Sequence, residues 1–270
     1  MSSKNTIEGI LLNKIPFKEK NIIGHILLRN GHKLSVVFYG GQGGGKRHIG
    51  STLQVGYLIS FSVTGNHKQN FEMLGSTEYR EKWYHSSITD NIRAFYLMCF
   101  FNETLDKFSP LATTPHDMDE KNSEQEGLFR LLSNAIFRLN KISSSENYKT
   151  SRELGVFLTK AMVELGVFPN TRNCEVSGES LKENDAVYLS AEKGGFVHFH
   201  FLEPEEKRLV DKEESKFSGL HRRLEAISKT KYSDITDQSF SMTECHELLK
   251  FICYQQHLSP TDFKTFSALI

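Results

Sequence analysis

Residues 31–47 have the sequence GHKLSVVFYGGQGGGKR. Leu34, Val36 and Phe38 alternate with other residues in the period-two pattern of a half-buried β-strand. The strand leads into a glycine-rich loop that contains Lys46 and Arg47. This stretch predicts a β-sheet domain with a cationic loop, and we expect the function of the chain to involve that loop.

Other strand-like runs surround this one in the first part of the chain. The Asn30-Gly31 pair before it favours a hairpin, because both central residues of a type I′ turn need positive φ. No helical period interrupts the runs, so they indicate a small closed or partly closed barrel. The predicted strands are residues 5–13, 21–29, 33–39, 51–64 and 69–75.

After Trp83 the apolar period becomes helical. Residues 166–204 lose this period and predict short strands and turns. Two helices begin with capping boxes, at Ser123 and Ser241, and Ser259-Pro260 predicts a closing helical turn. The predicted helices are residues 89–108, a helix that the Ser123 capping box opens and that runs through Leu139, and residues 149–165, 215–229 and 242–257. The buried face of the first is predicted to comprise Ile92, Phe95, Tyr96, Cys99, Phe100 and Leu105.

Charge is unevenly distributed along the chain. The formal net charge of the 270 residues is zero, yet residues 1–83 contain eleven Lys and Arg against five Asp and Glu. That segment therefore has a net charge of +6, and the remainder has −6. This distribution predicts a basic N-terminal domain joined to an acidic body.

The cysteines and the apolar segments indicate the compartment. Cys99, Cys174, Cys245 and Cys253 form no local pair suited to a disulfide. The first residues lack the apolar core of a signal peptide, and no segment approaches the roughly 20 apolar residues of a membrane span. We therefore expect a soluble, reduced, cytoplasmic protein that does not interact with membranes.

The loop from Gly40 to Lys46 resembles a nucleotide-binding P-loop, except that Arg47 replaces the magnesium-binding Ser or Thr. A strand pattern follows the loop, so no helix N-terminus is predicted there to receive phosphates. Three interpretations stay open: a P-loop enzyme, a flexible barrel loop, and a cationic loop that contacts the phosphates of nucleic acid. The third agrees best with the surrounding basic residues.

A barrel of this kind tracks single strands with cations and stacks bases on aromatic rings. Phe17 and Tyr39 are the stacking candidates, although either ring is equally suited to packing. The predicted DNA-binding residues are Lys14, Phe17, Lys18, Lys20, Arg29, Lys33, Tyr39, Lys46 and Arg47.

Residues 174–200 have the outline of a zinc knuckle without its full ligand set. Cys174, His198 and His200 are the candidate ligands, whereas a structural zinc site uses four, usually in two close pairs. We therefore expect a knuckle stabilised by packing, with no metal and no cofactor.

Several short motifs occur in order along the chain: Glu8-Gly9-Ile10-Leu11-Leu12, Asn30-Gly31-His32-Lys33-Leu34, Lys46-Arg47, Glu164-Leu165-Gly166, Cys174-x-x-Ser177-Gly178 and Gly194-Gly195. By the order and spacing of these motifs, the chain resembles the RecO family of bacterial recombination mediators over essentially its whole length.

The resemblance implies an α+β fold with four parts. These are an N-terminal DNA-binding OB-fold β-barrel (1–83), the first part of a helical domain (84–172), a small inserted zinc-ribbon-like β module (173–205) and the second part of the helical domain (206–270). Ser177 stands where zinc-bearing members have a second cysteine, and the downstream pair is missing. Cys174, His198 and His200 are therefore interpreted as vestigial.

The resemblance also implies a non-enzymatic role in DNA repair, in the cytoplasm with the nucleoid. Such a mediator binds single- and double-stranded DNA and anneals complementary strands without ATP. With RecR it loads RecA on DNA coated by the single-strand binding protein SSB. The alternative from the residues alone is an adaptor whose barrel binds protein and has no affinity for DNA.

In the family the helical body also receives the acidic, apolar C-terminal tail of SSB. A pocket for such a tail needs apolar walls and one or two cations. The candidates are Arg152, Phe157, Lys160 and Leu165.

Overall fold

A computed structural model describes residues 6–40, 53–63, 74–76, 78–118, 126–183, 185–205, 207, 219–236 and 238–269. The chain forms two compact units, Met1–Tyr148 and Lys149–Ile270. Among the described residues, no helix is long and apolar enough to cross a membrane. The four predicted parts of the chain and their boundaries stay predictions.

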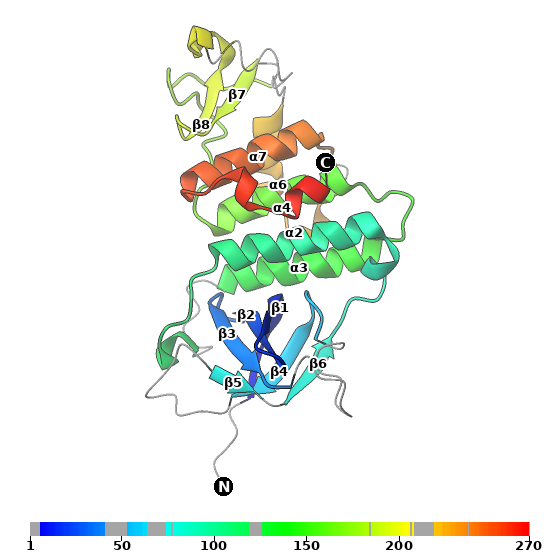
Figure 1. The fold of residues 1–270 in the computed structure, drawn as a ribbon. Coiled ribbons are helices and arrows are strands. Elements are labelled where there is room, and N and C mark those ends of the chain that lie inside the picture. Colours follow the sequence, from blue (N-terminus) through cyan, green and yellow to red (C-terminus); the bar gives the residue numbers. More distant parts are fainter. Residues whose placement is uncertain are drawn as a thin grey trace. The chain divides into compact units, whose positions relative to one another are not determined.

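The first unit contains a curled sheet that forms a half-barrel (Figure 1). Its strand order is β5-β3-β2-β1-β4-β6, and the described neighbours pair antiparallel except β3 and β5. The sheet confirms the mixed α+β class and agrees with a partly closed barrel. The strands are β1 (Thr6–Phe17), β2 (Asn21–Leu28), β3 (Lys33–Phe38), β4 (Leu58–Ser62), β5 (Leu74–Ser76) and β6 (Tyr79–Trp83).

The inner face of the half-barrel is the core predicted by the strand period. Leu34, Val36 and Phe38 are buried there, and Phe38 meets Phe61 edge-to-face with ring centroids 5.9 Å apart. Gly24 makes room for this arrangement, because a Cβ at that position would lie 2.8 Å from the Phe38 ring. The alternation in residues 33–38 thus predicted the buried face correctly.

The prediction of one unbroken strand over residues 51–64 was wrong. The described strand is only Leu58–Ser62, because the chain turns at Gly56, whose φ of 83° is accessible to glycine. The Gly56 N–H donates to the Leu11 carbonyl at 2.8 Å, which fixes the turn against β1. Most of the predicted strand 69–75 lies outside the described residues. Tyr79–Trp83 is a strand that the sequence did not predict, because its central residues are charged.

Two long helices, α2 (Ile92–Phe108) and α3 (Glu126–Ile142), run side by side in the first unit (Figure 1). The predicted face of α2 was partly wrong, because Ile92 is 65% exposed and Tyr96 is 39% exposed. Since α2 contacts both the sheet and α3, its burial extends beyond a single stripe. The buried apolar residues of α2 are Ala94, Leu97, Met98, Phe100, Phe101 and Leu105.

A polar cluster joins the last turn of α2 to three strands. Asp106 Oδ1 lies 2.8 Å from His25 Nδ1 and 3.1 Å from Lys33 Nζ. Asn13 donates from Nδ2 to Asp106 Oδ2 at 3.3 Å. These contacts hold α2 against β1, β2 and β3 through one carboxylate.

The second unit contains α4 (Thr150–Glu164), α6 (Leu220–Lys229), α7 (Met242–Gln255) and the hairpin of β7 (Val187–Ser190) and β8 (Gly195–His198). Helix α4 packs against both α6 and α7. The predicted capping box of α7 is confirmed, with Ser241 and Glu244 bonded in both directions.

The described 3₁₀ turns are Ile88–Asp90, Pro115–Met118, Phe199–Phe201, Tyr232–Asp234, Pro260–Asp262 and Phe266–Ala268.

Candidate functional site

The β1–β2 hairpin brings together several predicted DNA-binding residues at one end of the half-barrel. Lys18 and Lys20 are exposed at its tip, and the Lys18 ammonium lies over the Phe17 ring, 5.2 Å from its centroid. Lys18 has a φ of 52°, which turns the chain sharply between the strands. The tip therefore presents two cations and an aromatic face together.

Tyr39 lies at the same end of the sheet, because β3 pairs with β2 there. The Gly40 N–H donates to the Asn21 side chain at 3.2 Å, directly after the hairpin tip. The Tyr39 ring is 47% exposed and covers Gly75, where a Cβ would lie 2.4 Å from it. We call Phe17, Lys18, Lys20 and Tyr39 the basic end of the half-barrel.

The glycine-rich loop begins directly after this end, at Gly40. Lys46 and Arg47, the cations that the sequence favours most, lie outside the described residues. Their assignment to DNA stays a prediction, supported by the place at which the loop leaves the sheet.

Three other predicted residues lie elsewhere and contact the protein itself. Lys14 donates from Nζ to the Leu53 carbonyl at 3.0 Å. Arg29 pairs with Glu8 at 2.8 Å, and Lys33 pairs with Asp106. Arg29 and Lys33 flank the β2–β3 turn, at the end of these strands opposite to the basic end.

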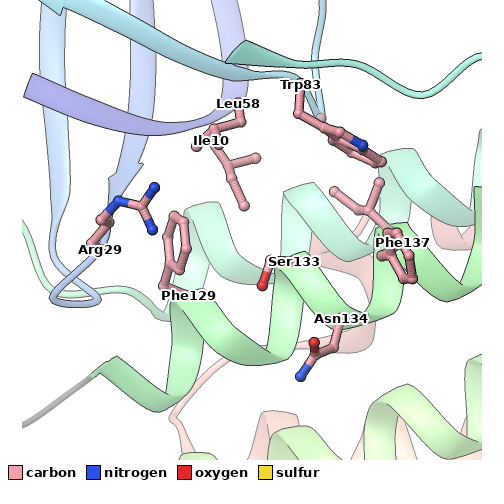
Figure 2. Close-up of a pocket in the computed structure, with 10 residues that line it drawn as sticks. Ile10, Arg29, Leu58, Trp83, Phe129, Ser133, Asn134 and Phe137 are labelled. Atoms are coloured by element: carbon pink, nitrogen blue, oxygen red, sulfur yellow. The ribbon is translucent and has the colours of Figure 1, made fainter. Parts of the chain in front are cut away.

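A pocket of about 370 Å³ opens at that opposite end, between the sheet and α3. Figure 2 shows Arg29 beside Phe129 at one side of it and Trp83 facing Phe137 at the other. The Arg29 guanidinium lies 5.3 Å from the centroid of the Phe129 ring, and the centroids of the Trp83 and Phe137 rings are 6.4 Å apart. The lining residues are Ile10, Arg29, Gly56, Leu58, Trp83, Phe129, Ser133, Asn134, Ile136 and Phe137.

The charges beside this pocket are predominantly positive. Glu8 lies between Arg29 and Lys82, whose ammonium is 3.6 Å from it. The hydrogen bond from Arg29, with the charges of Arg29 and Lys82, lowers the pKa of Glu8 despite partial burial. Two cations share one carboxylate, so an apolar pocket with a cationic side is available to an anionic, apolar ligand.

The sequence missed this pocket, although one signal was present. Phe137 falls outside the apolar stripe of its helix and is 62% exposed. An exposed phenylalanine next to a half-buried tryptophan is typical of a binding surface.

The residues predicted to receive the SSB tail form no such surface. Phe157 is fully buried, and Arg152 pairs with Glu153 at 2.7 Å. The Lys160 ammonium donates to the carbonyls of Ser228 and Thr230 at the end of α6. Burial lowers the pKa of Lys160, and Leu165 is half-buried at the end of α4. These side chains stabilise the second unit.

The degenerate knuckle retains a hydrogen-bonded thiol. Cys174 is buried, and its Sγ accepts the His198 N–H at 3.4 Å. Burial acts to raise the pKa of Cys174, but hydrogen bonds from the Ser177 hydroxyl and neighbouring backbone amides outweigh it and lower the pKa. Ser177 thus contributes a donor where a zinc ligand would stand.

His198 and His200, two of the three candidate zinc ligands, come together in the structure. β8 ends at His198, and a 3₁₀ turn places the His200 ring in a stack with it, 5.3 Å between centroids. In the part of the chain that the structure describes, no three His, Cys, Asp or Glu side chains are grouped to hold a metal ion. Zinc binding therefore stays a matter for experiment.

Comparison with known proteins adds one finding to this geometry. The family model described as recombination protein O C terminal matches residues 90–265, which is more than half of the chain. No curated protein matches the chain.

Proposed function

The chain belongs to the recombination protein O (RecO) family, and from this premise we propose that it is a mediator of DNA recombination and repair that binds single- and double-stranded DNA. It anneals complementary strands without ATP and, with RecR, helps to load RecA on SSB-coated DNA. The observation that supports a DNA role most directly is the basic end of the half-barrel. Lys18, Lys20 and Tyr39 lie together there, beside the start of the loop that contains Lys46 and Arg47.

Annealing on this surface requires no catalytic residue. Cations reduce the repulsion between two phosphate backbones, and exposed rings stack on unpaired bases. The Phe17 ring is partly covered by the Lys18 ammonium, whereas the Tyr39 ring is half-exposed. We therefore assign base stacking to Tyr39 before Phe17.

Replacing both Lys46 and Arg47 by alanine should weaken binding to an unstructured single-stranded oligonucleotide about 25-fold at 0.1 M salt. Each lost phosphate contact lowers the salt slope for single strands by about 0.7, so the double variant should lower it by about 1.4. Fluorescence anisotropy across a salt series, with oligonucleotides of different sequence, measures both quantities.

The matched control is the double alanine variant of Lys149 and Lys231, exposed residues of the second unit that change the net charge equally. This control should bind the oligonucleotide with the same affinity and the same salt slope as the unchanged protein. An unchanged slope in the Lys46 and Arg47 variant would remove the loop from the DNA surface. If the unchanged protein bound no DNA near physiological salt, the adaptor hypothesis would replace the mediator.

For the SSB tail we propose the pocket beside Arg29 in place of helix α4. An acidic peptide with an apolar carboxyl-terminal residue matches its apolar walls and the excess positive charge of Arg29 and Lys82. The volume of about 370 Å³ suffices for one or two large side chains.

The alanine variants Arg29→Ala and Phe137→Ala should each weaken binding of a labelled SSB tail peptide about tenfold, since a charge-assisted contact or an aromatic wall is worth about 1.5 kcal/mol. Their affinity for single-stranded DNA should change less than about threefold, because these residues lie away from the basic end. Fluorescence anisotropy with the peptide, and with the same peptide amidated at its C-terminus, measures the first effect.

Phe201→Ala, which truncates a 39% exposed ring of the second unit, is the control. If Arg152→Ala weakened binding of the tail peptide more than Arg29→Ala and Phe137→Ala do, helix α4 would be the binding site instead.

A further inference from the structure

His221 is a buried histidine on the first turn of α6 that the proposed function does not use. Its side chain is 1% exposed, and neither ring nitrogen has a hydrogen-bond partner among the described residues. Its ring packs edge-on against Phe196 of β8, with centroids 5.9 Å apart. A polar side chain without a hydrogen-bond partner is costly to bury.

The contact between His221 and Phe196 also helps to hold the β7–β8 hairpin against α6. We call the hairpin seated when this contact is made and released when it is broken. Phe196 is fully buried, and Gln255 of α7 donates to the Ala191 carbonyl at the hairpin turn at 2.9 Å. Strand β7 also packs against α7. The hairpin therefore rests on α6 and α7, and His221 lies directly under one of its core side chains.

Among the described residues, the charged groups that act on His221 come from two segments. Asp185 and Glu183 precede β7, and Arg222 and Glu225 belong to α6. The Asp185 carboxylate is 26% exposed and lies 3.8 Å from His198 Nδ1, while Glu225 pairs with Lys229 at 2.6 Å. On the other helices that pack nearby, Lys160 of α4 and Glu244 of α7 contact Ser228 and Arg223 of α6, not His221.

Burial is the largest influence on His221, followed by the charge of Arg222, and both lower its pKa. The carboxylates act in the opposite direction without reversing the shift. The ring is therefore neutral while the hairpin is seated at neutral pH.

We propose that His221 is a proton-sensitive latch that holds the β7–β8 hairpin on α6 when neutral and releases it when protonated. An imidazolium has two N–H donors and a charge, and among the described residues the seated site provides no acceptor for either N–H. In the released state the ring is no longer buried and reaches water, so the proton is bound more tightly there. Protonation thus shifts the equilibrium toward the released hairpin.

The sign of the pH dependence follows from linkage. Because the seated state has the lower pKa, its full stability is present above the ordinary histidine value, about 6.5, and decreases as the pH falls below that value. If the released ring titrates at about 6.5, the equilibrium constant for release rises about tenfold at pH 5.5.

Hydrogen–deuterium exchange of the full chain at pH 7.5 and pH 5.5, expressed as protection factors, tests this proposal. Peptides that cover Val187–His198 should lose about tenfold in protection at pH 5.5, while peptides from β1 and β2 should not. In His221→Leu the hairpin should be equally protected at both pH values. His257→Asn, which removes an exposed histidine, should keep the acid response of the unchanged protein.

Two results would overturn the latch: the same loss of protection at acid pH in His221→Leu, or no loss in the unchanged protein. If the leucine variant does not fold, NMR titration of the histidine Cε1–H signals in the unchanged protein decides the question. A buried signal that titrates below the exposed histidines, together with broadening of the hairpin amides, supports the latch. A titration like that of the exposed histidines contradicts it.

Discussion

Replacing Phe157 by alanine should lower the free energy of unfolding by about 3–5 kcal/mol, the usual effect of truncating a buried phenylalanine. Phe157 is fully buried in α4, which packs against α6 and α7. The variant should lose the fold of the second unit before it loses any partner selectively. Urea unfolding followed by far-ultraviolet circular dichroism measures the loss.

Val163→Ala provides the control on the same helix, because Val163 is 39% exposed. It should change the stability by less than about 0.5 kcal/mol. If Phe157→Ala were as stable as this control and bound the SSB tail poorly, Phe157 would be a contact residue after all, and the pocket beside Arg29 would lose its role.

Replacing Asp106 by asparagine should cost about 2 kcal/mol of stability at pH 7. Removing one partner of a fully buried ion pair costs about 3–5 kcal/mol, and this site retains some solvent contact. The variant leaves Lys33 and His25 facing a neutral amide where a carboxylate had paired with both. Trp83, the only tryptophan of the chain, lies in the same unit, so urea unfolding followed by its fluorescence reports the change.

Acid should remove the difference in unfolding free energy between the unchanged protein and the Asp106→Asn variant. Burial acts to raise the pKa of Asp106, but the hydrogen bond and charge of His25, with those of Lys33, lower it to about 2. The stabilisation is therefore complete above the ordinary aspartate pKa and disappears as the pH falls through about 2. A stability difference that stayed constant between pH 7 and pH 2 would show that the carboxylate charge is not its source.

The sequence predicted the elements whose signals are local. The alternation of Leu34, Val36 and Phe38 identified β3 and its buried face, and the Ser241 capping box identified the start of α7. The motifs also predicted the RecO family, which the match to residues 90–265 confirms. Each of these signals lies within a few neighbouring residues, where periodicity and capping chemistry operate.

The candidate sites were less accessible to sequence reasoning. The nine predicted DNA-binding residues share charge or aromaticity. Of the seven that the structure describes, only Phe17, Lys18, Lys20 and Tyr39 meet at one end, because the β2–β3 pairing brings them there. Lys33 has the same charge as Lys18 and yet pairs with Asp106, 73 positions away. Composition cannot distinguish an exposed cation from one that neutralises a distant carboxylate.

The sequence by itself determined that a strand-rich first part precedes a helical body, that the first third is basic, which family the chain belongs to, and that the second knuckle cysteine is lost. Only the tertiary structure decided which cations remain at the surface, that Phe157 faces the core, and that Arg29 and Phe129 border one pocket. It also placed His221 under Phe196 without a hydrogen-bond partner among the described residues. The physical reason is the range of the interactions. Periodicity and capping depend on residues within one or two turns, whereas burial and pairing depend on contacts between residues far apart in the chain.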